Sequence, residues 1–239
     1  MKTEQKWKIC DCLEGLPEIQ DKSIDLILTD PPYNIDFQGK VNFEMVDGKF
    51  GLKEVNYNYP PFDLNIISQM SNKLKSTGSI VVFYDNKEIT TLWNVLKDNN
   101  LRPKQTLYWY KGKKGINPRH NFNSTVETAV WAVKSKDYVW NGNGNTPNCF
   151  IEDFHELNYP PNNYHPNQKP IQLFEWIIRI LTNKYDNVLD GYLGSGTSLE
   201  ACMRLERNCI GFEIDPQWEP IYKKRLRLDN TKLNEWNER

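Results

Sequence analysis

The sequence lacks the long hydrophobic runs of a membrane protein. Its longest apolar stretches, Ser23–Leu28 and Trp176–Leu181, are far shorter than the ~20 residues that cross a bilayer. The first residues also lack the apolar core of a signal peptide. We therefore expect a cytoplasmic protein with no membrane partner.

Cysteine pairs of the kind that hold zinc are also absent. The five cysteines are an odd number and none forms a CxxC pair, which argues against structural zinc and against a disulfide framework. We expect no metal. Cys10, Cys202 and Cys209 stand in apolar patterns and are predicted to be buried thiols.

An excess of charge of either sign is missing as well. The chain has 30 basic and 31 acidic residues, a net charge of −1. Such a balance provides no overall attraction to nucleic acid, so any nucleic-acid partner must bind a local basic patch.

Short apolar runs alternate with helical patterns along the 239 residues, which predicts one α/β domain with a largely parallel sheet. The predicted strands are Trp7–Cys10, Ile24–Thr29, Ser79–Tyr84, Thr106–Tyr110, Thr128–Val133, Asn187–Asp190 and Cys209–Ile214. The predicted helices are Leu64–Lys75, Ile89–Asn99, Ile171–Thr182, Thr197–Glu206 and Gln217–Leu228. Residues 34–62 and 134–164 are rich in Asn, Gly, Pro and Tyr and are predicted to be long loops. The basic run at residues 223–227 is predicted to be the solvated face of the last helix.

A glycine-rich turn follows the predicted strand at 187–190. Gly194 and Gly196 allow the backbone to approach a ligand at a helix N-terminus, but no GK[ST] follows and Leu199 replaces the last glycine of GxGxxG. Glu213 lies 19 residues beyond Gly194, a spacing at which a carboxylate accepts both hydroxyls of a ribose. This pattern predicts an adenosine-type ligand. The alternative is an ordinary strand–turn–helix capped by Thr197.

A second motif, Asp30-Pro-Pro-Tyr33, ends the predicted strand at 24–29. The strand brings Asp30 to the carboxyl edge of the sheet, where open α/β folds bind ligands. Pro31 and Pro32 stiffen the turn and remove two N–H donors. A carboxylate, bare carbonyls and the Tyr33 ring suit a planar group with an exocyclic NH₂. The alternative is a strand-ending turn with Asp30 as a local cap.

These two motifs resemble those of a known family. Asp30-Pro-Pro-Tyr33 and Asp190-Gly-Tyr-Leu-Gly-Ser-Gly-Thr197 resemble the catalytic and cofactor motifs of S-adenosylmethionine-dependent DNA amino-methyltransferases, and His165-Pro-Asn-Gln-Lys-Pro170 resembles their HPxxKP segment. The motif order matches the circularly permuted β-class, which includes restriction-modification enzymes. The family usually has Asp-Pro-Phe before the glycines, whereas this chain has Gly191 and Tyr192. Tyr192 keeps an aromatic ring, and Gly191 loosens the turn.

The resemblance implies a Rossmann-like methyltransferase fold, a seven-stranded, mostly parallel sheet with one antiparallel strand and helices on both faces. It implies S-adenosylmethionine as cofactor, DNA as partner, and methyl transfer to N6 of a flipped-out adenine. The implied catalytic residues are Asp30, Pro31, Pro32 and Tyr33.

The implied cofactor site lies along the same edge of the sheet. By the resemblance, Glu213 binds the ribose, Asp11 and Cys12 lie against the adenine, and Lys169 pairs with the cofactor carboxylate. Asp11 also fits a capping box with Glu14, and one residue can serve both purposes. The full implied set is Asp11, Cys12, Asp30, Lys169, Asp190, Tyr192, Gly194, Ser195, Gly196, Thr197 and Glu213.

A basic segment supplies the local patch that DNA requires. Residues 101–123 contain six Lys or Arg residues, a histidine, the aromatic run Tyr108-Trp-Tyr110 and no acidic residue, so phosphate contacts are predicted there. The alternative is a solvated loop between two edge strands. The candidate DNA-binding residues are Lys111, Lys113, Lys114, Arg119 and His120. The resemblance also places Glu127 near the target base.

The single domain spans 1–239, with 34–62 and 111–165 as loop insertions that are candidates for a lid or for DNA recognition. Because little chain is left for a separate recognition domain, a homodimer is expected, and a cognate restriction endonuclease is a possible partner. Asp30 in the first catalytic position favours adenine-N6. The alternatives are cytosine-N4 methylation, and a non-catalytic DNA-binding subunit with the same fold.

Overall fold

Apolar side chains alternate along the central strands and build a sheet that is buried on both faces. In β2 (Ile24–Thr29), Leu26 and Leu28 point to one face and Ile27 to the other. The same alternation separates Val81 from Ile80. The computed structural model describes residues 2–32, 62–112, 122–151 and 168–226, and the backbone of two short strands at 44–46 and 49–51.

The remaining elements follow in chain order. The strands are β1 (Gln5–Ile9), β3 (Glu44–Val46), β4 (Lys49–Gly51), β5 (Leu74–Tyr84), β6 (Arg102–Tyr110), β7 (Val126–Val133), β8 (Cys149–Ile151), β9 (Asn187–Asp190) and β10 (Asn208–Glu213). The helices are α1 (Cys12–Gly15), α2 (Ile66–Lys73), α3 (Ile89–Asp98), α4 (Ile171–Leu181), α5 (Thr197–Arg204) and α6 (Glu219–Arg225), with 3₁₀ turns at Leu16–Glu18 and Pro216–Trp218.

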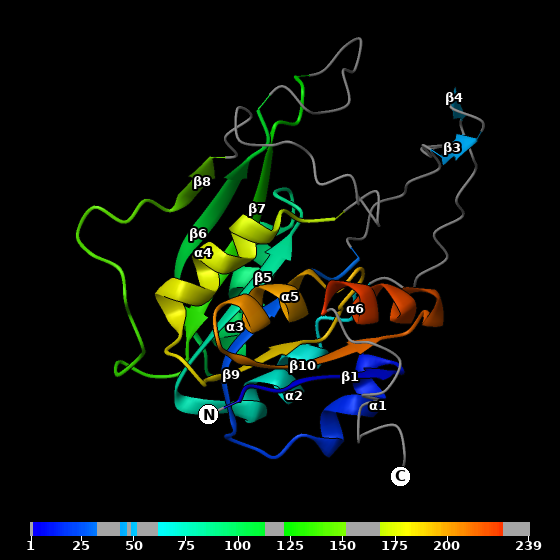
Figure 1. Ribbon diagram of the computed structural model, residues 1–239. Helices are drawn as coiled ribbons and strands as arrows, with labels where there is room; N and C mark the ends of the chain where they lie inside the picture. The colour runs from blue at the N-terminus through cyan, green and yellow to red at the C-terminus, as the bar shows by residue number, and fades with distance from the viewer. Residues whose placement is uncertain are drawn as a thin grey trace.

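The main sheet has the order β1-β10-β9-β2-β5-β7-β6-β8 (Figure 1). Among its strands only β7 runs against its neighbours, as the resemblance implies. The expected number of seven strands is corrected to eight in the described part of the chain. The additional strand, β8, is three residues long and pairs in parallel with β6 at the edge of the sheet. It is too short to give a periodic pattern in a segment rich in turn-forming residues.

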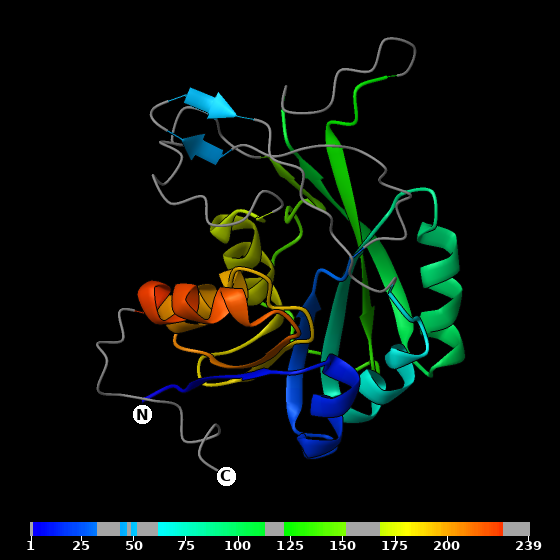
Figure 2. The same ribbon diagram turned by 90° about the vertical axis from the view of Figure 1, so that its right-hand side faces the viewer.

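Helices cover the two faces of the sheet as two layers (Figure 2). Helices α4, α5 and α6 pack on the face that carries Leu26 and Val81. Helices α1, α2 and α3 pack on the face that carries Ile27 and Ile80. The α/β fold and its two helical layers therefore agree with the sequence prediction.

The direction in which the chain winds reverses between β9 and β2. After β9 the chain passes through α5 to β10, on one side of β9. After β2 it passes through α2, on the opposite face, to β5 on the other side. Such a switch point is where open α/β sheets bind ligands, beyond the carboxyl ends of the strands. Asp30 and Asp190 both stand at this position.

The predicted elements are recovered with small shifts at their ends. The largest shift is at β5, which begins five residues before the predicted Ser79. Strands β7 and β8 lie inside 111–165, and strands β3 and β4 lie inside 34–62, so neither range is a loop insertion throughout. Cys202 and Cys209 are buried as predicted, whereas Cys10 is only half-buried and Cys12 is buried instead. No helix in the described residues is long and apolar enough to span a membrane.

Candidate active site

The Asp-Pro-Pro segment begins where β2 leaves the core. Every residue of β2 is buried, whereas the Asp30 side chain is 22% exposed. Pro31 is buried and Pro32 is half-buried. Because proline has no N–H, the turn offers oxygen acceptors rather than donors. Tyr33 lies outside the described residues, and its role stays a prediction.

Lys169 lies against Asp30. Its Nζ is 2.5 Å from Asp30 Oδ2 and 3.0 Å from Glu127 Oε2, and its side chain is 7% exposed. Burial disfavours the charged ammonium, but the two carboxylates outweigh burial and raise the pKa of Lys169. The ammonium is therefore charged and held at the catalytic motif. Its predicted role as the partner of the cofactor carboxylate stays a prediction.

Glu127 joins Lys169 to a second lysine. Glu127 Oε1 accepts a hydrogen bond of 3.0 Å from Lys111 Nζ. Burial raises the pKa of Glu127, but the two lysines outweigh burial and lower it. Lys111 follows the last residue of β6 and was predicted to contact DNA phosphates. It is paired with the carboxylate of Glu127 on β7. The other predicted DNA contacts, Lys113, Lys114, Arg119 and His120, lie outside the described residues.

The Asp190 carboxylate connects the glycine turn to β2. Its Oδ1 accepts hydrogen bonds from the Thr29 hydroxyl and from the backbone N–H of Tyr192, both at 3.0 Å, and its Oδ2 accepts one from the Ser198 hydroxyl at 2.6 Å. Burial raises the pKa of Asp190 to about 6, against the effect of these bonds. The residue that precedes Asp30 is therefore bonded directly to the start of the cofactor motif.

Glu213 lies beside the glycine turn, as its spacing predicts. One carboxylate oxygen accepts the Gly194 N–H at 2.8 Å, and the other accepts the Asp215 N–H at 2.9 Å. Burial raises the pKa of Glu213 to about 7. A buried carboxylate at the tip of β10 can accept further hydrogen bonds from hydroxyl groups.

Both glycines of the turn have a backbone conformation that other residues rarely adopt. Gly194 and Gly196 have φ of +51° and +77°, the left-handed region that favours glycine. A Cβ at Gly196 would lie 2.7 Å from the Tyr222 ring, whereas a Cβ at Gly194 would meet no atom within 4 Å. Helix α5 has Gly196 at its N-cap and no side-chain cap, so the alternative with Thr197 as cap is wrong. The space at Gly194 fits a ligand that approaches the backbone.

The segment before α4 connects the two motifs. Gln168 Oε1 accepts hydrogen bonds from the Ser195 hydroxyl at 3.1 Å and from Arg225 at 2.6 Å, and the next residue, Lys169, contacts Asp30. Arg225 also pairs with Glu200 at 2.5 Å and is 6% exposed. The solvated face predicted at 223–227 is therefore wrong for Arg225.

The predicted adenine side is built by the turn after β1. Asp11 caps α1, and its side chain accepts a hydrogen bond of 2.8 Å from the Leu13 N–H. Cys12 is buried, and burial raises the pKa of its thiol. A Cβ at Gly191 would lie 2.9 Å from Cys12 Sγ and 2.8 Å from Met70 Cε. Gly191 is therefore closely packed rather than loose. Tyr192 packs edge-on against Phe62, with ring centroids 5.7 Å apart.

Sequence reasoning assigned no role in this site to Thr29, Ser198, Gln168, Tyr222 and Arg225, which act through tertiary contacts. Thr29 and Ser198 adjoin the motifs, Gln168 lies inside the HPxxKP segment, and Arg225 belongs to the basic run at 223–227. The Tyr222 hydroxyl, for example, donates to the Gly194 carbonyl at 2.9 Å from a helix 28 residues away in the chain.

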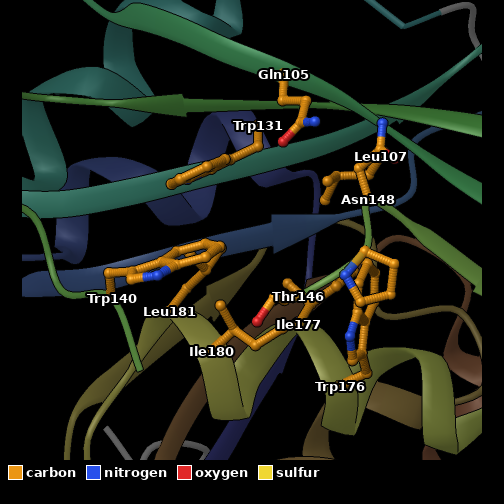
Figure 3. A pocket seen from close by; sticks show the side chains of 11 residues that line it. Gln105, Leu107, Trp131, Trp140, Thr146, Asn148, Trp176, Ile177, Ile180 and Leu181 are labelled. Atoms are coloured by element: carbon orange, nitrogen blue, oxygen red, sulfur yellow. The ribbon is translucent and has the colours of Figure 1, made fainter. Parts of the chain in front are cut away.

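An apolar cavity elsewhere shares no residue with this site. It lies between α4 and strands β6 and β7, lined by three tryptophans, Trp131, Trp140 and Trp176 (Figure 3). Trp131 and Trp140 stack with ring centroids 5.3 Å apart. Within the described part of the chain, no group of three His, Cys, Asp or Glu side chains is placed to bind a metal.

Comparison with known proteins finds relatives that match most of this chain. Type II methyltransferase M.HpaI of Haemophilus parainfluenzae is 29% identical over 245 residues, which cover 93% of this chain and 74% of the relative. Type II methyltransferase M2.MboI of Moraxella bovis is 28% identical over 235 residues, covering 90% and 85%.

Solved structures agree with these relatives. The crystal structure of the M1.HpyAVI–SAM complex has a TM-score of 0.70 and 27% identity, covering 93% of this chain and all of that one. PvuII DNA methyltransferase, described as cytosine-N4-specific, has a TM-score of 0.73 at 21% identity, covering 98% and 89%, and shows the shared fold alone. The N6/N4 methyltransferase family model, described as DNA methylase, matches residues 24–224. The chain therefore belongs to this family of DNA methyltransferases.

Proposed function

We propose that this chain transfers a methyl group from S-adenosylmethionine to the N6 amino group of adenine in DNA. The observation that carries the proposal is the junction of the two motifs at the switch point, where Thr29 is bonded to Asp190 and residues 168 and 169 contact Ser195 and Asp30. A methyl donor on the glycine turn and a base at Asp30 would lie within reach of each other.

The cofactor fits the residues present. The turn at Gly194 has room in front of its backbone, and Glu213 supplies a buried carboxylate for ribose hydroxyls. Asp11 and Cys12 lie after the neighbouring strand β1, where the adenine is expected. The bound cofactor supplies an activated methyl group on sulfur. Asp190, whose carboxylate accepts three hydrogen bonds from the protein, holds the turn in place.

Asp30 and the Pro31 carbonyl act on the amino group of the base. The lone pair of this amine is delocalised into the ring, which makes it a weak nucleophile. Hydrogen bonds from the amine to the Asp30 carboxylate and the Pro31 carbonyl move the nitrogen toward a tetrahedral geometry and direct its lone pair at the methyl group. Positioning and electrostatics therefore supply most of the catalysis.

The reaction is tested by incubating the protein with labelled S-adenosylmethionine and mixed-sequence DNA, followed by hydrolysis and identification of the nucleoside by mass spectrometry. N6-methyldeoxyadenosine is expected, and Asp30→Ala should abolish it while cofactor binding is largely kept. N4-methyldeoxycytidine would support the cytosine alternative, which uses the same geometry. Cofactor binding without transfer to any DNA would support a non-catalytic subunit.

The base must leave the duplex to reach Asp30, and Tyr33 is proposed to replace its lost stacking. The fluorescence of 2-aminopurine at the target position should rise when the protein binds, and rise less with Tyr33→Ala. An unchanged signal with the wild-type protein would contradict flipping.

Lys113, Lys114, Arg119 and His120 are proposed to contact DNA phosphates. Replacing all four by alanine should weaken DNA binding and reduce its dependence on salt. Lys111 is less suited to this role because Glu127 already neutralises it.

The chain is further proposed to act as a homodimer in the cytoplasm and to protect DNA against a cognate restriction endonuclease. Relatives named Type II methyltransferases support the second point. Sedimentation of monomers both free and on DNA would exclude the dimer. Sequencing the methylated positions in cells that express the protein would define the recognition site for which an endonuclease can be tested.

A further inference from the structure

Four charged side chains form a row of alternating positive and negative charge at the carboxyl end of β2. In order they are Asp30, Lys169, Glu127 and Lys111, and each of the three successive pairs is 2.5–3.0 Å apart. They come from four different parts of the fold: the residue after β2, the segment before α4, β7, and the residue after β6. The tertiary structure alone brings them together.

Lys169 is held within this row of charges by its surroundings. Its Nζ lies 5.4 Å from the centre of the Phe83 ring and 5.9 Å from that of Trp109. A buried ammonium among aromatic rings needs carboxylate partners to stay charged. In the described residues Asp30 and Glu127 are such partners, so losing either one lowers the pKa of Lys169 and removes a restraint on its position.

Glu127 is the partner that does not belong to the Asp-Pro-Pro motif. One of its oxygens is bonded to Lys111 and the other is paired with Lys169, and its side chain is 23% exposed. Both oxygens therefore lie against lysines, and among the described residues the link from Glu127 to Asp30 runs through Lys169. Lys169 in turn donates a hydrogen bond to Asp30 Oδ2, which restrains the position of that carboxylate.

We propose that Glu127 is a positioning residue for methyl transfer, which acts through Lys169 to hold the Asp30 carboxylate in the orientation that receives the amino group of the base. This inference rests on the proposed function. It differs from a purely cofactor-binding role of Lys169, in which loss of Glu127 would change the affinity for the cofactor rather than the rate at saturation.

The test is Glu127→Gln, which removes the charge and keeps the shape. We expect the single-turnover rate at saturating DNA and cofactor to fall about tenfold to hundredfold, because small misplacements of reacting groups have effects of this size. The cofactor Kd, measured by calorimetry, should stay within about twofold, since no cofactor contact is removed.

The pH profile adds a measurement that a merely structural role would not change. In the wild-type protein Asp30 and Glu127 both raise the pKa of Lys169. Without the charge of Glu127 this pKa falls, so the rate should decline at a lower pH on the alkaline side. The charged groups around Lys169 in the described residues are Asp30 after β2 and Glu127 on β7, with Lys111 beyond Glu127, and Asp190 on β9 interacts with Asp30.

The matched control is Glu175→Gln on α4. Glu175 has a similar exposure, 19%, and pairs with Arg179 and Arg204 at 3.9 and 3.8 Å. It should keep the wild-type rate and pH profile. If Glu127→Gln proves too unstable to measure, Lys111→Met removes the outer pair and should lower the rate in the same direction by a smaller factor.

The outcomes distinguish a failure of the positioning role of Glu127 from a failure of the proposed function. If the wild-type protein and Glu175→Gln transfer methyl groups and Glu127→Gln does so equally fast at every pH, the positioning role is excluded and the function stands. A weakened cofactor Kd with an unchanged saturating rate also overturns it. If the wild-type protein transfers no methyl group to either base, the proposed function fails and the inference fails with it.

Discussion

The Thr29 hydroxyl donates a hydrogen bond of 3.0 Å to Asp190 Oδ1, between residues 161 positions apart in the chain. Thr29 is the last residue of β2 and Asp190 is the last of β9, and both are buried. This bond joins the segment that presents Asp30 to the turn that presents Gly194. The two motifs are therefore joined by a contact between a side-chain hydroxyl and a buried carboxylate, in addition to the pairing of β2 with β9.

Thr29→Val should weaken this junction. The substitution keeps the shape but leaves a buried carboxylate with one fewer donor, which costs about 1–3 kcal/mol of unfolding free energy. Denaturant unfolding measures the change. Thr29→Ser retains the hydroxyl and loses only the methyl group, so it should lose clearly less stability. A Thr29→Val variant as stable as the wild-type protein would show that the bond does not matter.

The stability of the protein should depend on the ionisation of Glu213. Burial raises its pKa in the folded state to about 7 from the ordinary 4.5, so the folded state binds more protons than the unfolded state between these two values. Stability from this group is thus highest below pH 4.5 and is lost as the pH rises through 7. Glu213→Gln should remove this loss, roughly 1–3 kcal/mol between pH 4.5 and 8. Unfolding free energies of both proteins across this range provide the comparison, and parallel curves would contradict it.

Cofactor affinity should also depend on the ionisation of Glu213, but it should increase with pH whereas the stability decreases. Ribose hydroxyls donate stronger hydrogen bonds to an ionised carboxylate than to a neutral one. The Kd for S-adenosylmethionine should therefore fall as the pH rises from 6 to 8. Calorimetry should show weaker and less pH-dependent binding with Glu213→Gln, and an identical pH dependence would remove Glu213 from the cofactor site.

Gly194 and Gly196 should respond differently to alanine. At Gly196 the new Cβ would lie 2.7 Å from the Tyr222 ring, in addition to the strain of φ +77°, so Gly196→Ala should lose about 2 kcal/mol or more of stability. Gly194→Ala bears only the left-handed strain of about 1 kcal/mol, yet its methyl group would occupy the space in front of the turn. We expect thermal melting to separate the two variants and calorimetry to show lost cofactor binding with Gly194→Ala. Unimpaired binding would place the cofactor elsewhere.

Restoring the usual family residue at position 191 should not improve this protein. A proline there would bring its Cβ within 3 Å of Cys12 Sγ and Met70 Cε, so Gly191→Pro should destabilise the fold by about 1–3 kcal/mol. Adding Met70→Ala makes room and should reduce the combined loss below the sum of the two single changes. Additive losses in chemical unfolding would show that Met70 does not cause the conflict.

The local patterns of the chain determined much of this structure. Alternating and continuous apolar runs located β2 and β9 at their observed bounds, because the burial of a strand determines which of its consecutive residues are apolar. Strand β8 was missed because its three residues lie in a segment rich in turn-forming residues. Helix α1 was missed as an element, although Asp11 was recognised as a candidate cap, because four residues are too few for a helical period. The candidate residues Asp30, Gly194 and Glu213 were found because their motifs combine rigid turns with carboxylates at strand ends.

The sequence by itself therefore determined the family, the class of fold and the chemical groups at the strand ends. Only the tertiary structure decided which charges face each other. Lys169 joins Asp30 to Glu127, Lys111 forms an ion pair with Glu127, and Arg225 is buried against Glu200. Ion pairs and hydrogen bonds between distant residues depend on which strands are neighbours in the sheet and on how helices cross it. Such contacts leave no periodic trace along the chain, because each partner is separately compatible with a solvated surface.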